Sequence, residues 1–184
     1  MGILNDAPGS TDGGADKRQV AINADPNVAS DAGELIQPAQ EGGRFSVDLV
    51  EQEAQGGHAI ARHVGRSKEQ LIRQADRNRI GFGKRGIWED RVGSFTSLLA
   101  ANSLVNETLL KFQSIVHNVS SGKISFAELQ AWFDRPTGYE SYRRRYYDPV
   151  VIRDTFGVRV ILIRDSRSAR GFRIKTAYPN NRNE

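Results

Sequence analysis

The chain has 184 residues, 38% of them hydrophobic and 26% charged, which is enough for one compact domain with a tail but not for two full domains. It contains no cysteine, which excludes disulfides and thiolate metal sites. Residues 1–44 carry seven acidic and three basic side chains, a net charge of −4, whereas residues 45–184 carry 15 and 23, a net charge of +8. The basic part favours polyanionic partners and leaves RNA, DNA and anionic membranes open.

Signals for a membrane, for secretion and for a metal are missing from the sequence. No apolar run approaches the roughly 18 residues that a membrane span needs, and the amino terminus lacks a charged segment followed by an apolar one. The three histidines have no zinc-binding spacing. We therefore expect no membrane span, no secretory signal, no metal and no other cofactor.

The first predicted boundary falls near residue 45. Residues 1–44 are rich in Gly, Ala, Asp, Ser and Pro and show no sustained period, which predicts a flexible linker or tail. The folded domain is expected over residues 45–184. Ser46 is predicted to cap a short helix that ends at Gly56-Gly57, and residues 58–64 are expected to add one or two helical turns.

Two segments match a helix-capping box, in which a Ser hydroxyl and a Gln or Glu side chain satisfy amides at a helix start. They are Ser67-Lys68-Glu69-Gln70 and Ser125-Phe126-Ala127-Glu128. The first predicts a helix over the residues that follow it. The second predicts a short helix that holds Leu129 and Trp132 and ends at Pro136.

The segment between the two capping boxes contains a loop and a helix. Residues 77–93 include four glycines and are predicted to form a loop with Ile87 and Trp88 as anchors. Residues 97–118 have apolar side chains at steps of three and four, which predicts a long helix with Thr96 at its N-cap.

From Tyr139 onward the pattern changes to that of strands. Residues 150–152, 158–163 and 172–178 are rich in β-branched and aromatic side chains, and the last two runs are expected to pair as an antiparallel hairpin. Helices followed by strands predict an α+β fold.

The last predicted strand carries two hydroxyl side chains near its end. Side chains alternate along a strand, so Phe172, Ile174, Thr176 and Tyr178 are expected to share one face, with the last two roughly 7 Å apart. Both residues suit any β-strand, and they also suit a site that needs two hydroxyl donors.

A basic segment surrounds His63, which lies between Arg62 and Arg66. An imidazole titrates near neutrality, and adjacent arginines keep it neutral to lower pH and attract phosphate. These are the properties of a general base that acts on a nucleic acid, although a lone histidine in a helix is also common as a surface or packing residue. The run from Tyr142 to Tyr147 interleaves arginines with tyrosines, which suits either phosphate contact with base stacking or the charged face of an edge strand.

Taken together, these segments resemble a known family. The matching residues are Gly56-Gly57-His58, His63-Val64-Gly65-Arg66-Ser67, Ser94-Phe95-Thr96, the Trp132 segment and Thr176-Ala177-Tyr178-Pro179. In their order and spacing they resemble the bacterial ribonuclease A-like toxin domains at the carboxy termini of contact-dependent inhibition proteins and other polymorphic toxins. The resemblance covers about residues 45–180 and implies an α+β fold without disulfides, with N-terminal helices packed on a V-shaped antiparallel β-sheet.

The resemblance also implies a site made of His, Arg, Thr and Tyr. By matching, these are His63, Arg73, Thr176 and Tyr178, with His58 as the alternative base. The sequence departs from the family at the arginine, because the family position falls on Gln74 and Arg73 lies one residue earlier. A shift of one residue turns a helical side chain by about 100°, so a neighbouring arginine such as Arg77 is an alternative.

The activity implied by the resemblance is that of a metal-independent ribonuclease toxin used in competition between bacteria. The 2′-hydroxyl of RNA would attack the adjacent phosphorus and give a 2′,3′-cyclic phosphate. The expected partners are the RNA substrate and a cognate immunity protein. The domain is expected to be secreted or delivered by a secretion system and to act in the cytoplasm of a target cell. A noncatalytic nucleic-acid-binding module and a metal-dependent nuclease are the alternative functions.

Overall fold

Two antiparallel sheets and five helices make up residues 45–82 and 90–182, the part of the chain that the computed structural model describes. The elements are α1 (Leu49–Ala54), α2 (Ala59–His63), α3 (Lys68–Phe82), β1 (Asp90–Ser94), α4 (Leu98–Lys111), α5 (Gln113–Ser120), β2 (Phe126–Trp132), β3 (Gly138–Arg143), β4 (Val151–Thr155), β5 (Gly157–Arg164) and β6 (Phe172–Asn180). The predicted tail over residues 1–44 and the predicted anchors Ile87 and Trp88 lie outside the described residues.

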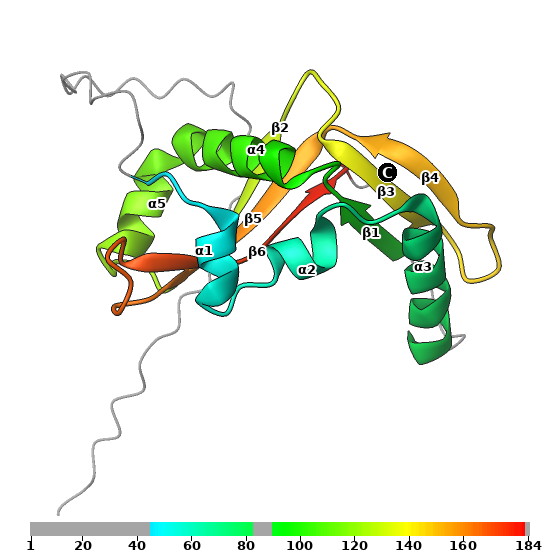
Figure 1. Ribbon diagram of the computed structural model, residues 1–184, viewed down its shortest axis with the longest axis horizontal. Coiled ribbons are helices and arrows are strands. Elements are labelled where there is room, and N and C mark those ends of the chain that lie inside the picture. The colour runs from blue at the N-terminus through cyan, green and yellow to red at the C-terminus, as the bar shows by residue number, and fades with distance from the viewer. Residues whose placement is uncertain (1–44, 83–89, 183–184) are drawn as a thin grey trace, which may run out of the picture.

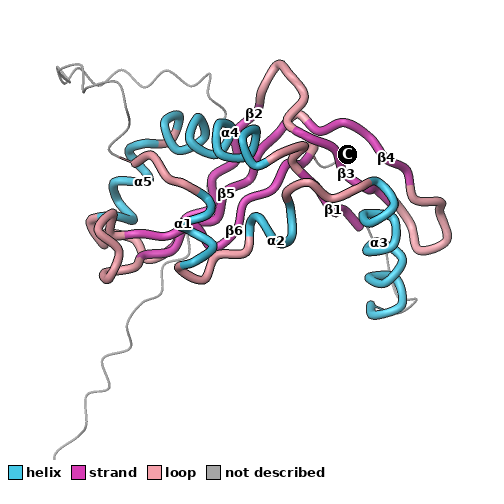
Figure 2. Tube along the Cα trace, viewed as in Figure 1, coloured by secondary structure: helices cyan, strands magenta, loops and turns pink. Residues whose placement is uncertain are grey.

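The six strands form two three-stranded sheets, ordered β1-β3-β4 and β2-β5-β6, in which all pairs are antiparallel. Figures 1 and 2 show the second sheet at the centre of the molecule, with α4 and α5 beside it, and the first sheet next to α3. This arrangement confirms the α+β class, and the predicted hairpin is β5 and β6. None of the described helices is long and apolar enough to cross a membrane.

The core lies between one face of the β2-β5-β6 sheet and the helices α4 and α5. Alternate residues of β5, namely Val158, Val160 and Leu162, are fully buried, because a strand with one face against helices hides every second side chain. The fully buried apolar partners from the two helices include Val105 and Val116. The opposite face of this sheet is therefore available for a site.

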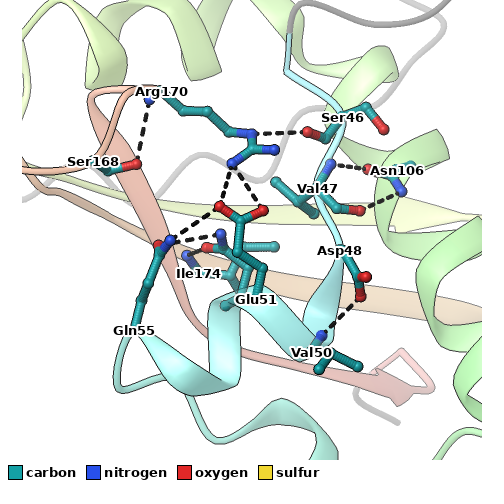
Figure 3. A network of polar contacts seen from close by, with 11 residues as sticks. Ser46, Val47, Asp48, Val50, Glu51, Gln55, Asn106, Ser168, Arg170 and Ile174 are labelled. Carbon is teal, nitrogen blue, oxygen red and sulfur yellow. Dashed lines mark hydrogen bonds and ion pairs between the residues drawn. The ribbon is translucent and has the colours of Figure 1, made fainter.

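Polar contacts attach α1 to the β5-β6 hairpin (Figure 3). The Glu51 carboxylate accepts hydrogen bonds from Arg170 Nη1 at 2.9 and 3.1 Å. The buried Gln52 side chain accepts a 2.7 Å hydrogen bond from the Ile174 amide of β6. These contacts hold α1 on β6, so that the chain leaving α1 enters α2 beside the same strand.

The helix starts were predicted with mixed success. The Ser67 capping box is confirmed, since the Ser67 hydroxyl accepts from the Gln70 amide at 3.2 Å and the Gln70 side chain accepts from the Ser67 amide at 2.9 Å. The predicted cap Ser46 is wrong. The Val47 backbone is instead held extended by the side chain of Asn106, and Asp48 caps α1.

The long predicted helix over residues 97–118 is in fact two helices. α4 begins after Ser97, not Thr96, because the Ser97 hydroxyl accepts from the Ala100 amide at 3.1 Å. At Phe112 the backbone leaves the helical region, with φ −116° and ψ 30°, and α5 starts at the next residue. Each helix can then follow the twisted sheet with its own apolar face.

The helix predicted from the Ser125 capping box is wrong, because residues 126–132 form the strand β2. Ala127, Leu129 and Ala131 alternate into the core and pair with β5 along its length. A capping box stabilises one helix end only, whereas a paired strand satisfies a whole ladder of backbone groups and buries a face.

The loop predicted over residues 77–93 is wrong at both ends. α3 continues to Phe82, and residues 90–94 form β1 in the middle of the helical half of the sequence. Gly93 suggested a loop, but it fits a strand here because β6 crosses β1 closely. A Cβ on Gly93 would overlap the carbonyl oxygen of Pro179.

Candidate active site

The end of β6 changes face at a β-bulge. Ile161 of β5 lies opposite Thr176 and Leu162 lies opposite Ile174, so the exposed Lys175 is the extra residue. Ile174 before the bulge and Ala177 after it both face the core. The predicted shared face of Thr176 and Tyr178 is therefore found, but the prediction that Phe172 and Ile174 lie on that face is wrong. The bulge turns the two hydroxyl side chains away from the core.

The bulge is also where the chain enters α2. The His58 amide donates to the Lys175 carbonyl at 3.2 Å. A Cβ on Gly57 would lie 2.8 Å from the backbone oxygens of Gln52 and Ile174, so only glycine permits this approach. The Gly-Gly-His segment thus places the start of α2 on the bulged part of β6.

His63 ends α2 and is fixed by its own backbone. The Phe95 amide donates to the His63 carbonyl at 2.8 Å, and the Gly65 amide donates to the Phe95 carbonyl at 2.9 Å. Gly65 has a φ of +64°, which lets the chain turn immediately after this contact. The His-Val-Gly and Ser-Phe-Thr segments are therefore hydrogen-bonded to each other, although they lie about 30 residues apart in the sequence.

The hydrogen bond of the His63 ring selects its tautomer. Nδ1 lies 2.9 Å from the Gly93 carbonyl oxygen, which can only accept, so Nδ1 carries the proton and Nε2 of the neutral ring is an acceptor. Burial lowers the pKa of His63 below its usual range, the Gly93 bond opposes this, and the charges of His58, Arg62 and Arg66 lower it further. At neutral pH the ring is a neutral base with Nε2 as its basic atom.

The side chain of His63 contacts Tyr178 across the space between α2 and β6. Their ring centroids are 5.1 Å apart, with 37° between the ring planes. Both residues line a cavity of about 210 Å³ between the two sheets. Its other lining residues are Arg91, Gly93, Glu140, Arg159, Pro179, Asn180 and Asn181.

Two arginines that line the cavity were not predicted from the sequence. Arg159 lies on β5 directly opposite Tyr178, and Arg91 lies on β1. Arg159 sits between the buried Val158 and Val160, and a charged residue inside an apolar alternating run was the signal that could have found it. Arg91 had no such signal, because β1 itself was not predicted.

Thr176 lies on the same face of β6 as Tyr178, two residues before it, and is not among the residues that line the cavity. Its side chain is only 7% exposed, and its hydroxyl has no hydrogen-bond partner among the described residues. An unpaired buried hydroxyl costs about 1–3 kcal/mol. A ligand oxygen that reaches this hydroxyl would recover that energy.

The remaining predicted site residues lie outside the cavity. His58 is half-buried at the start of α2, and burial followed by the Arg62 charge lowers its pKa below the usual range. Arg73 and Arg77 are both exposed on α3. Arg143, from the predicted basic cluster, is 4% exposed and forms an ion pair with Asp76 of α3, so it holds α3 against β3. The described residues contain no cluster of side chains suited to a metal ion.

Comparison with known proteins identifies the family. The family described as "Bacterial CdiA-CT RNAse A domain" matches residues 57–179, which include every element from α2 to the end of the Thr-Ala-Tyr-Pro segment. The chain belongs to this family. The membership confirms the predicted resemblance and the ribonuclease A-like fold without disulfides.

A solved structure is also similar to the chain. It is described as the crystal structure of a CdiA-CT/CdiI complex from Y. kristensenii 33638, with 25% sequence identity and a TM-score of 0.52. The similarity covers 67% of this chain and 99% of that one. No curated protein sequence matches the chain. Family and structure together identify a nuclease toxin domain of the contact-dependent inhibition class.

Proposed function

We propose that this domain is a metal-independent endoribonuclease that cleaves RNA through its own 2′-hydroxyl. The observation that carries the proposal is the His63 ring, which Gly93 holds through Nδ1 so that Nε2 is its basic atom, and which lies against Tyr178. In the proposed reaction Nε2 takes the proton of the 2′-hydroxyl, and the 2′-oxygen attacks the adjacent phosphorus. The bond from phosphorus to the 5′-oxygen breaks, which leaves a 2′,3′-cyclic phosphate.

The negative charge that develops on the nonbridging oxygens needs donors that are already in place. Thr176, with its unpaired buried hydroxyl, and Tyr178 are proposed to supply two of them. A guanidinium is proposed as the third, the role for which the sequence suggested the exposed Arg73. The departing 5′-oxygen takes its proton from Tyr178 or from water.

The test compares wild-type protein with two histidine variants on RNA and DNA in the presence of EDTA. We expect wild type to cleave RNA to 2′,3′-cyclic phosphate ends and to leave DNA intact, since DNA lacks the 2′-hydroxyl. His63→Ala should lose RNA cleavage by at least 10²-fold, the lower range for a general base. His117→Ala is the matched control, because His117 is exposed on α5.

Each alternative has its own result in the same experiment. Loss of cleavage in EDTA would indicate a metal-dependent nuclease. Binding of both RNA and DNA without cleavage would indicate a noncatalytic module. Cleavage lost in His58→Ala and kept in His63→Ala would move the base to His58.

We propose further that a cognate immunity protein neutralises the domain. The similar solved structure is a complex between CdiA-CT and CdiI, which supports a partner of this kind. The surface that covers the cavity of this chain should be acidic, by electrostatic complementarity to Arg91 and Arg159. Delivery into the cytoplasm of a target cell, where RNA is available, belongs to the same proposal.

A further inference from the structure

The proposed reaction needs a guanidinium near the phosphate, and the arginines that line the cavity are the candidates. Among the described residues, Arg91 and Arg159 line it, together with one acidic side chain, Glu140. Glu140 already accepts from Arg153 Nε at 2.8 Å. The cavity wall therefore carries an excess of positive charge, which suits a phosphate diester.

The position of Arg159 follows from strand pairing. It lies opposite Tyr178 on β6 and opposite Gln130 on β2, and side chains opposite one another in an antiparallel sheet project from the same face. Its neighbours Val158 and Val160 point into the core. The backbone of the central strand thus aims the Arg159 side chain at the face that carries the two hydroxyls.

Two nitrogens of the Arg159 guanidinium have partners that hold it in place. Nε donates to Gln130 Oε1 at 3.2 Å, and Nη1 forms a 3.2 Å ion pair with Glu128. Gln130 is itself fixed, because it exchanges two 3.0 Å hydrogen bonds with the side chain of Asn180. These partners lie on β2 and β6, on either side of β5, so the guanidinium is oriented before any ligand arrives.

The guanidinium also lies beside the proposed reactive residue Tyr178. Nη1 lies 3.5 Å from the Tyr178 hydroxyl, at the outer limit of a hydrogen bond, and Nη2 makes no hydrogen bond or ion pair with another described residue. The Arg159 side chain is 31% exposed, so solvent and ligands reach it. The guanidinium is therefore held through Nε and Nη1, and its remaining donor Nη2 is the one that suits an oxygen of a phosphate.

The other candidate arginines are differently engaged. Arg91 Nη1 donates to the carbonyls of Asn181 and Arg182 at 3.2 and 2.9 Å, which fastens the end of the chain. Arg73 is exposed on α3, a helix that packs against β1, β3 and β4, the strands of the other sheet.

We infer that Arg159 is a catalytic residue of this domain that binds the nonbridging oxygens of the scissile phosphate next to Tyr178 and Thr176, in the role suggested for Arg73. The inference rests on the proposed ribonuclease activity. Glu128 and Gln130 are positioning residues that act through the guanidinium of Arg159.

The test measures cleavage of a short RNA by Arg159→Ala and Arg73→Ala. Arg159→Ala should lower kcat/KM by 10²–10³-fold, as expected for loss of one preorganised donor to a developing oxyanion, and free guanidinium ion at nondenaturing concentration should restore part of it. Arg73→Ala should stay within threefold of wild type. Arg135→Ala is the matched control, since Arg135 also pairs with a glutamate, Glu107, but is 52% exposed on the loop after β2.

A second variant covers the case in which Arg159→Ala does not fold. Arg159→Lys keeps the charge and the stem but loses the fork of donors, and kcat/KM should fall at least tenfold while the melting temperature stays near that of wild type. Inorganic phosphate serves as a probe that needs no turnover. Its binding, measured by calorimetry, should weaken at least tenfold in Arg159→Lys and persist in His63→Ala.

The outcomes separate the two proposals. If wild type cleaves no RNA, the ribonuclease proposal fails, and the phosphate titration still tests Arg159. If wild type cleaves RNA and both Arg159 variants do so equally well, the assignment of Arg159 is wrong. Loss of activity in Arg73→Ala with full activity in Arg159→Lys would return the role to α3.

Discussion

The crossing of β1 and β6 at Gly93 couples the fold to the site, and Gly93→Ala tests that coupling. The new Cβ would overlap the Pro179 carbonyl oxygen and lie 3.1 Å from the carbonyl carbon and 3.3 Å from Pro179 Cδ. Optimal carbon contacts are at ~3.5–4.0 Å, so the strands must separate by roughly 1 Å. Neither strand is free to move, because Gly93 pairs with Glu140 and Pro179 pairs with Val158.

Two costs follow from this displacement. Overpacking costs about 1–3 kcal/mol, and loss of the bond from His63 Nδ1 to the Gly93 carbonyl costs about 0.5–1.5 kcal/mol. We expect the free energy of unfolding to fall by about 2–4 kcal/mol. A catalytic group displaced by 1 Å loses about 10²-fold in rate, so RNA cleavage should fall by that factor in conditions where the variant remains folded.

Urea unfolding and the initial rate of RNA cleavage measure the two effects. Gly65→Ala is the control, because its Cβ would meet nothing within 4 Å and only its φ of +64° is unfavourable. That conformation costs about 1–2 kcal/mol. A Gly93→Ala variant that is more stable than Gly65→Ala, or that cleaves RNA at the wild-type rate, would refute the steric argument.

Two further predictions concern His63 and the start of α3. Since only neutral His63 accepts a proton and burial lowers its pKa, kcat/KM for RNA should hold as pH falls to 6.5 and decline only below it. Below pH 6.5 the unfolded chain binds a proton at His63 that the folded chain does not. The free energy of unfolding should therefore fall as pH drops from 6.5 toward the lower pKa of the folded state. In His63→Gln, this part of the pH dependence of the free energy of unfolding should be missing. Ser67→Ala removes a cap of α3 and should cost ~1 kcal/mol in urea unfolding, with RNA cleavage unchanged; an unaltered midpoint would mean that the capping box contributes nothing.

The sequence alone predicted those features whose cause lies within a few residues or in a family pattern. The Ser67 capping box is local, because both partners lie within one turn of helix. The β5-β6 hairpin is likewise visible as two β-branched runs around a turn. The candidate His63 and the pair Thr176 and Tyr178 came from the residue pattern together with the resemblance, and the structure places His63 against Tyr178.

Features that depend on a distant partner were decided only by the tertiary structure. Residues 126–132 carry a helix-start signal but become a strand, because β5 offers them a complete ladder and a buried face. At the bulge, the Lys175 carbonyl accepts a hydrogen bond from the His58 amide, more than a hundred residues away. The bulge determines which face of the sheet the two hydroxyls occupy. Arg159 reaches the cavity for the same reason: strand pairing across β2, β5 and β6, and not any local pattern, determines which side chains share a face.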